Sequence, residues 1–174
     1  MPISLKRLYL SFYFNKKIIK DVLPINLIIL IFGFCFDERI EKEVLPKSLI
    51  YLEFGNCFNR KIEKEVLPKS LIYLVFGNFF NQKIEKGIFK NFNSLTFLIF
   101  GSNFKQKILR GVIPKNIEFI IFHNKNYKKI KENVLYSSSL FITKHLENKT
   151  IIYNEKHEKY VDNYSFKNFT KYEN

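Results

Sequence analysis

The chain has 174 residues, 47% of them hydrophobic, and a formal net charge of +13. This apolar content excludes an intrinsically disordered chain, and the length suffices for one domain with its own core. A basic chain attracts nucleic acid or anionic membrane, although an AT-rich genome by itself also raises the content of Lys.

The first 36 residues argue against a secretory leader and against a membrane span. The first 20 residues lack a continuous apolar run after a short basic segment, so no signal peptide is expected. The most apolar stretch, residues 22–36, has 15 residues and holds Pro24 and Asn26, whereas a spanning helix needs roughly 20 apolar residues. We therefore expect a buried strand there, and an intracellular, cytoplasmic protein.

A unit of 22 residues recurs along most of the chain. The segment LPKSLIYLEFGNCFNRKIEKEV, residues 45–66, is followed directly by LPKSLIYLVFGNFFNQKIEKGI. When each coil is numbered from its first strand residue, position 1 is held by Leu5, Leu27, Leu49, Leu71, Leu95 and Ile117. The spacing is 24 residues between Leu71 and Leu95, where residues 90–94 predict a small bulged loop, and 22 elsewhere. A unit recurring at this period is typical of a stacked solenoid.

Six short strands are predicted, one at the start of each coil. The segment L-x-x-L-x-F ends in the period-2 alternation of a strand, and stacking the coils makes the strands parallel neighbours. Position 7 is glycine in four coils, and we expect it to allow a sharp turn at the end of the strand. The predicted fold is a leucine-rich-repeat-like solenoid with a parallel β-sheet on one face and irregular loops on the other.

Seven positions of the coil are apolar and are predicted to point inward, namely positions 1, 4, 6, 10, 14, 18 and 19. Position 14 is isoleucine in all six coils, and position 18 is always β-branched, beginning with Val22. One coil cannot bury these side chains alone, so its neighbours must cover them. Position 11 is polar in the first four coils, and we expect its side chain to point inward and bond the backbone of the adjacent coil.

The repeats are predicted to occupy residues 1–136, followed by a C-terminal tail or cap at residues 137–174. The tail keeps scattered apolar residues that could fold over the open end of the stack, because the terminal units of a solenoid need a cover. From Glu155 onward the segment is polar, and we expect it to be partly disordered, with a short helix as the alternative.

The run L-P-x-S-L-x-x-L-x-F-G-x-x-F-N-x-x-I resembles the FNIP repeat, a leucine-rich-repeat-like unit of proteins from social amoebae and from giant viruses that infect amoebae. The resemblance covers about residues 1–136 and is strongest in the second to fourth coils. It implies a solenoid that binds proteins, in the host cytoplasm if the chain is viral. Members of the family often carry an F-box that recruits a ubiquitin ligase. This sequence shows none, so we do not expect that role.

Strand positions 3 and 5 predict an apolar, aromatic strip on the concave sheet face. The candidate partner-binding residues are Ile29, Tyr51, Tyr73, Val75, Phe97, Ile99, Phe119 and Ile121. Six coils at about 4.8 Å make a strip roughly 25 Å long, and aromatic side chains at such a site are typical binding anchors. We expect a scaffold that binds a protein partner. Cross-strand pairing alone, self-association, and a shortened paralogue without a function are the alternatives.

Two basic ladders support a different function. Position 13 is Lys or Arg in all six coils and position 16 in the first five, while neighbouring acidic residues partly neutralise them. As an alternative, these ladders would bind nucleic acid or an anionic membrane surface, although no motif that reads RNA or DNA is present.

Patterns typical of catalysis or metal binding are missing. No phosphate loop, nucleophile elbow or carboxylate pair is recognisable, so we expect neither an enzyme nor a cofactor. Cys35 and Cys57 both occupy position 9, one coil apart. Without a matching pair of His or Cys they do not predict a zinc site, and in an intracellular protein we expect reduced thiols rather than a disulfide.

Overall fold

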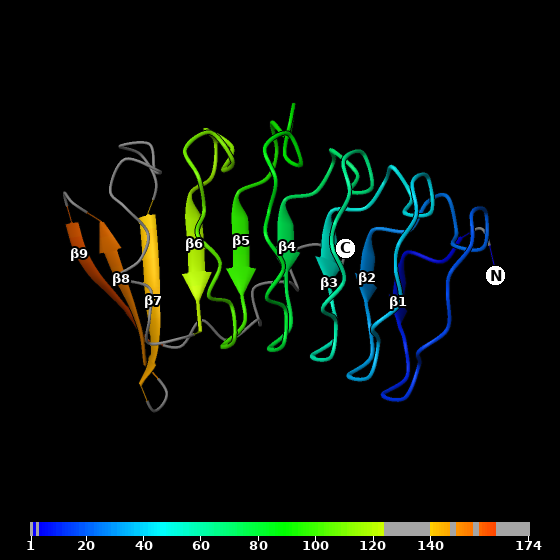
Figure 1. The fold of residues 1–174 in the computed structure, drawn as a ribbon, viewed down its shortest axis with the longest axis horizontal. Coiled ribbons are helices and arrows are strands. Elements are labelled where there is room, and N and C mark those ends of the chain that lie inside the picture. Colours follow the sequence, from blue (N-terminus) through cyan, green and yellow to red (C-terminus); the bar gives the residue numbers. More distant parts are fainter. Residues whose placement is uncertain (1, 3, 124–139, 147–148, 155–156, 163–174) are drawn as a thin grey trace.

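A single sheet of nine strands runs the length of the molecule (Figure 1). The computed structural model describes residues 2, 4–123, 140–146, 149–154 and 157–162, and of the last three ranges the backbone alone. The strands are β1 (Arg7–Tyr9), β2 (Ile29–Ile31), β3 (Tyr51–Glu53), β4 (Tyr73–Val75), β5 (Phe97–Phe100), β6 (Phe119–Phe122), β7 (Leu140–Leu146), β8 (Lys149–Asn154) and β9 (His157–Asp162). They lie in the sheet in the order of the chain. The predicted solenoid with its parallel sheet is thereby confirmed.

The register of the parallel strands follows the sequence repeat. Ile29 pairs with Tyr51 and Tyr51 pairs with Tyr73, an offset of 22 residues. Tyr73 pairs with Phe97, an offset of 24, so the two inserted residues are absorbed outside the sheet. Equivalent side chains of successive coils therefore stand side by side, and every column of the repeat becomes a physical row.

The sheet continues beyond the last predicted coil. Strand β7 pairs with β6 in parallel, with Phe119 opposite Leu140, and β8 and β9 are then added in antiparallel fashion. Figure 1 shows these three strands at the end of the stack opposite the N-terminus. The tail therefore extends the edge of the sheet. The short helix that was the alternative beyond Glu155 is wrong for residues 157–162, which form β9.

The seven predicted inward columns form one continuous core. In the second to fifth coils every side chain of these columns is buried. Phenylalanines of positions 6 and 10 interleave there: the rings of Phe54 and Phe58 lie 4.0 Å apart within one coil, and Phe54 and Phe76 lie 5.6 Å apart between coils. Such offset stacks add to the free energy gained from apolar burial alone.

The first coil is covered on one side only. Leu5, Leu8, Leu10 and Phe14 are partly buried against the core, and Val22, which was predicted to point inward, is 43% exposed. The prediction failed for Val22 because a position-18 side chain is buried between two coils, and the described part of the chain supplies a neighbour on one side only.

The glycines of position 7 have a different role from the predicted one. A Cβ on Gly55 would lie 1.9 Å from the carbonyl oxygen of Gly33, and one on Gly77 would lie 2.2 Å from that of Gly55. None of these glycines has a positive φ. They are required because the backbones of adjacent coils touch there, rather than because the chain needs a special turn.

Two polar ladders join the coils outside the sheet. The backbone N–H of Asn59 donates to Asp37 Oδ1 at 2.8 Å, and that of Asn81 donates to Asn59 Oδ1 at 2.9 Å. The predicted bonding of position 11 to the adjacent coil is confirmed, but the side chains lie near the surface rather than inward. The second ladder was missed: Ser70 Oγ donates to the carbonyl of Leu49 at 2.6 Å, which satisfies a backbone group between coils.

Candidate functional site

The parallel register brings the eight predicted partner-binding residues together on the outer side of the sheet. They alternate along each strand with the buried position-4 residues, so they point away from the core. One row contains Ile29, Tyr51, Tyr73, Phe97 and Phe119. The other contains Val75, Ile99 and Ile121. We call this surface, made of positions 3 and 5 of β2 to β6, the strand face.

Four aromatic rings of the strand face lie in an unbroken row, and the last three of them are stacked. The ring centroids of Tyr51 and Tyr73 are 5.9 Å apart. Those of Tyr73 and Phe97 are 4.5 Å apart and nearly parallel, and those of Phe97 and Phe119 are 4.4 Å apart with an interplanar angle of 2°. The contacts between neighbouring rings restrict their motion, so the row is an ordered apolar surface.

The strand face is not uniformly exposed. Six of the eight predicted residues are half-buried, whereas Tyr51 is 5% and Ile99 7% exposed. The hydroxyl of Tyr51 donates to the carboxylate of Glu53. Burial, followed by the negative charge of Glu53, raises the pKa of Tyr51 far above its usual range. Tyr51 therefore stays protonated and engaged within the protein, and the more accessible aromatic surface comes from Tyr73, Phe97 and Phe119.

The basic ladders lie away from the strands, on the opposite wall of the coils, which we call the loop face. Position-13 cations pair with position-15 glutamates, namely Lys17 with Glu41 at 3.6 Å, Arg39 with Glu41 at 3.6 Å, Lys61 with Glu63 at 3.7 Å and Lys83 with Glu85 at 3.2 Å. Position-16 lysines reach the next coil, where Lys20 meets Glu43 at 2.6 Å and Lys42 meets Glu65 at 2.8 Å. In the first coils the ladders are thus largely neutralised.

Position 17 has an unusual backbone in every described coil. Its φ is positive in Asp21, Glu43 and Glu65, and in Gly87 and Gly111, which replace the acidic residue in the fourth and fifth coils. Side chains rarely adopt this conformation without cost. A carboxylate is therefore placed at a strained position in the first three coils, where in the second and third it accepts a hydrogen bond from a lysine of the preceding coil.

These inter-coil pairs predict a specific pH dependence. The hydrogen bond from Lys20 lowers the pKa of Glu43 below its usual 4.5, and that from Lys42 does the same for Glu65. A lowered carboxyl pKa stabilises the fold above about pH 4.5, and this contribution is lost as the pH falls through the folded-state pKa.

The double variant Glu43→Gln/Glu65→Gln should therefore melt slightly below the wild type at pH 7. The difference should shrink as the pH is lowered from 7 to 3, because the two carboxylates of the wild type take up protons as the pH falls toward their lowered pKa values. The effect is small, since the groups are fully exposed. Thermal melts of both proteins across this pH range check it, and a difference that persists unchanged at pH 3 would rule out the ion pairs as its cause.

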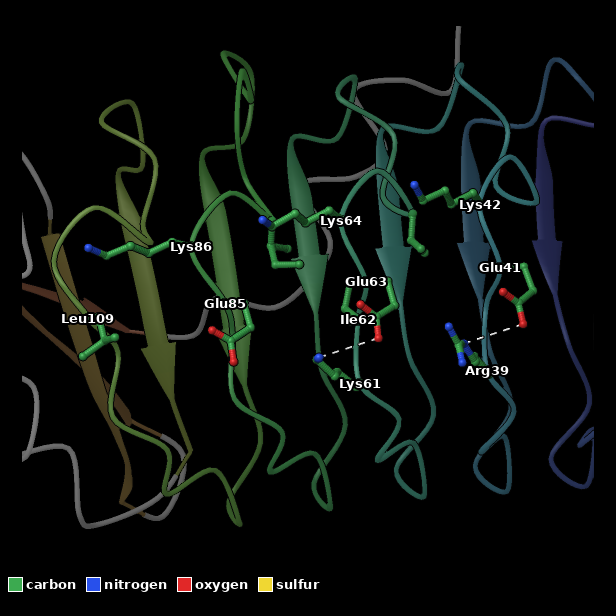
Figure 2. Close-up of a pocket in the computed structure, with 12 residues that line it drawn as sticks. Arg39, Glu41, Lys42, Lys61, Ile62, Glu63, Lys64, Glu85, Lys86 and Leu109 are labelled. Carbon is green, nitrogen blue, oxygen red and sulfur yellow. Dashed lines mark ion pairs between the residues drawn. The ribbon is translucent and has the colours of Figure 1, made fainter.

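A groove of about 1000 Å³ runs along the loop face of the second to fifth coils. Figure 2 shows its side chains on the segments in front of the sheet, with Lys42, Lys64 and Lys86 along one side. Glu63 and Glu85 lie below these lysines in the view, where Glu63 pairs with Lys61, and position 15, which they hold, is occupied by Leu109 in the fifth coil. The floor of the groove is apolar and its walls are charged.

The two cysteines lie side by side as their shared position predicted. Burial, and then the neighbouring Cys35, raises the pKa of the Cys57 thiol. Both are free thiols, and the raised pKa of Cys57 lowers the fraction of reactive thiolate at that residue. Among the described residues no group of three or more His, Cys, Asp or Glu side chains is placed to hold a metal ion.

Models of known families match this chain along its repeats. The FNIP Repeat matches residues 1–35, 14–57, 36–79, 58–89 and 80–125. The chain belongs to the FNIP-repeat family. The last match ends at residue 125, and the structure describes residues 4–123 without a gap. The FNIP coils therefore coincide with the parallel stack of β1 to β6.

A solved structure shares the architecture of these FNIP coils. It is described as the crystal structure of CroV588, a novel circular LRR protein, and is 44% identical to this chain with a TM-score of 0.75 over 81% of the chain. The present chain spans 20% of that protein. No curated protein matches. The FNIP solenoid is thus a leucine-rich-repeat-like fold, a class typical of protein-interaction scaffolds.

No helix in the described part of the FNIP chain combines the length and apolar character needed to cross a bilayer. The strongly apolar residues 22–36 instead contain β2, whose central Leu30 is completely buried. The prediction of a buried strand in this stretch is confirmed.

Proposed function

We propose that this protein is a non-enzymatic scaffold that binds a protein partner on the strand face. The observation that carries the proposal is the stacked row of Tyr73, Phe97 and Phe119, which is half-buried and flanked by the aliphatic residues Val75 and Ile121. Ordered aromatic side chains surrounded by aliphatic ones are the usual energetic centre of a protein interface.

The charge distribution supports this choice over binding of nucleic acid or membrane along the whole loop face. The cations of position 13 in the first four coils each lie within ion-pair distance of a glutamate. Position 16 is likewise paired in the first two coils. A partner that needs free cations along the full ladder would first have to displace these carboxylates. The strand face, by contrast, offers apolar area without that cost.

Replacement of Tyr73 by glutamate tests the strand face. Tyr73→Glu puts a charge in the centre of the aromatic row and should weaken capture of a protein partner from a lysate by at least about tenfold, because a buried unpaired charge opposes binding. Capture by the wild type should persist as salt is raised, since the contact is apolar. The measurement is a pull-down with quantified bound protein over a salt series.

Phe79→Glu is the matched control. Phe79 is 49% exposed and lies in the turn after β4 rather than on the strand face, so this change should leave capture unaltered. Thermal melts of both variants verify folding. Loss of capture by both variants, or capture that disappears at moderate salt in the wild type, would contradict the proposal.

A further inference from the structure

The charge of the loop face changes abruptly along the stack. The second and third coils, residues 27–70, contain seven Lys and Arg and seven Asp and Glu. The fourth and fifth coils, residues 71–116, contain seven Lys and Arg but a single acidic residue, Glu85. The second and third coils together are therefore neutral in formal charge, whereas the fourth and fifth carry an excess of six positive charges with a single carboxylate among them.

Part of this difference is the loss of the position-17 carboxylates, which face the position-16 lysines of the preceding coil. Lys20 and Lys42 each hold a glutamate of the next coil, but Lys64 meets Gly87 instead, with its Cε 3.4 Å from where a Cβ would stand. Lys86 faces Gly111 by the same repeat, and a Cβ there would have no neighbour within 4 Å. In the described part of the chain neither Lys64 nor Lys86 forms an ion pair.

Position 15 of the fifth coil has also lost its carboxylate. Leu109 replaces the glutamate that pairs with position 13 in the earlier coils, which leaves Lys107 without an ion pair among the described residues. Arg110 follows as the next position-16 cation and is exposed. The three carboxylates that line the groove already form ion pairs: Glu41 with Lys17 and Arg39, Glu63 with Lys61, and Glu85 with Lys83.

We propose that Lys64, Lys86, Lys107 and Arg110 form a binding site for an acidic protein segment, separate from the strand face. The second and third coils show the geometry that such a segment would reproduce. There a lysine of position 16 donates a hydrogen bond to a carboxylate at 2.6 to 2.8 Å, and in the fourth and fifth coils a partner's Asp or Glu takes the place left by glycine. Leu109 adds an apolar contact beside the charges.

Other anionic partners fit the groove less well. Its lining contains no aromatic side chain, and single-stranded nucleic acid is usually held by bases stacked on aromatic rings. The cations Lys64 and Lys86 line a hollow, whereas a bilayer presents a flat surface. A flexible chain carrying carboxylates enters such a groove and matches the groups that the missing glutamates would have supplied.

The test is fluorescence anisotropy at low salt with a labelled peptide of about ten glutamates, compared with a thymidine oligonucleotide of equal length and with phosphatidylserine vesicles. The variant Gly87→Glu/Gly111→Glu restores the missing carboxylates at positions whose backbone already carries Glu43 and Glu65 in the earlier coils. It should weaken peptide binding by at least about tenfold. Lys86→Gln, which needs no backbone adjustment, should weaken it in the same direction.

Two controls separate the site from general electrostatics. Ile19→Glu/Ile25→Glu introduces the same change in charge at two exposed residues of the first coil, 61% and 69% accessible, and should reduce binding far less. Lys20→Gln removes a position-16 lysine that already holds Glu43 and should leave binding nearly unchanged. Equal losses in the site and control variants, or tighter binding of the oligonucleotide or vesicles than of the peptide, would overturn the proposal.

Discussion

Replacement of Ile62 by aspartate is expected to unfold the stack. Ile62 is 3% exposed and stands in a buried column between Ile40 and Ile84. The change removes a core side chain and buries a carboxylate that has no partner, at a cost of at least about 4 kcal/mol. Because each coil is stabilised only by its neighbours, the defect in the third coil interrupts the stack near its middle. Thermal and denaturant melts followed by circular dichroism measure the loss.

Ile62→Val is the matched control for this experiment. It keeps the apolar, β-branched character and should cost only about 1 kcal/mol. A melting curve of Ile62→Asp that coincides with the wild type would refute the assignment of position 14 to the interior, and with it the register of the whole solenoid.

Replacement of Gly55 by alanine is expected to destabilise the protein almost as strongly, although a single methyl group is added. The new Cβ would lie 1.9 Å from the carbonyl oxygen of Gly33 and 2.9 Å from its carbon. Both atoms belong to the backbone, so no side-chain rotation relieves the clash and the second and third coils must move apart. The expected loss is about 3 kcal/mol or more, measured by denaturant unfolding.

Gly111→Ala separates this clash from the ordinary cost of replacing glycine. At Gly111 the φ is +78° but nothing lies within 4 Å of the added Cβ, so the cost should be about 1 kcal/mol. If Gly111→Ala proved as destabilising as Gly55→Ala, contact between coils could not be the reason for glycine at position 7.

The fold was predictable because its core repeats in the sequence. A column such as Ile40, Ile62 and Ile84 identifies an inward position without knowledge of the structure, and the offset between Leu71 and Leu95 locates the insertion. The rows of the strand face followed in the same way, because period-2 alternation determines which side of a strand each residue occupies. The exposure of the individual residues could not be predicted in this way. Tyr51, for example, is buried and donates a hydrogen bond to Glu53.

Backbone constraints were hidden from the sequence. The glycines of position 7 suggested a turn, but the distance between adjacent backbones that requires them appears only when coils are stacked. At position 17 the backbone is unusual but the residue type does not indicate it. Glu43 and Glu65 have a positive φ, although acidic residues at this position are what any solvent-exposed site could carry. The signal was available only in comparison with Gly87 and Gly111, which occupy the same place in later coils.

The seventh parallel strand was missed because its side chains depart from the repeat. Leu140 pairs with Phe119 at an offset of 21 residues, but residues 137–139 are all serine, where a leucine was sought. Backbone hydrogen bonding continues the sheet without the side chains that identified the earlier strands. The predicted boundary at residue 136 therefore marks the end of the sequence repeat and not the end of the sheet.

Site-specific photo-crosslinking tests the binding role of the strand face most directly. A benzophenone amino acid at Phe97 places the reactive group in the centre of the aromatic row, and the same group at Phe79 serves as the control away from it. We predict a discrete protein adduct from position 97 that is absent from position 79 and is lost in the presence of Tyr73→Glu. Equal adducts from both positions, or an adduct at position 97 that survives Tyr73→Glu, would contradict the assignment of partner binding to the strand face.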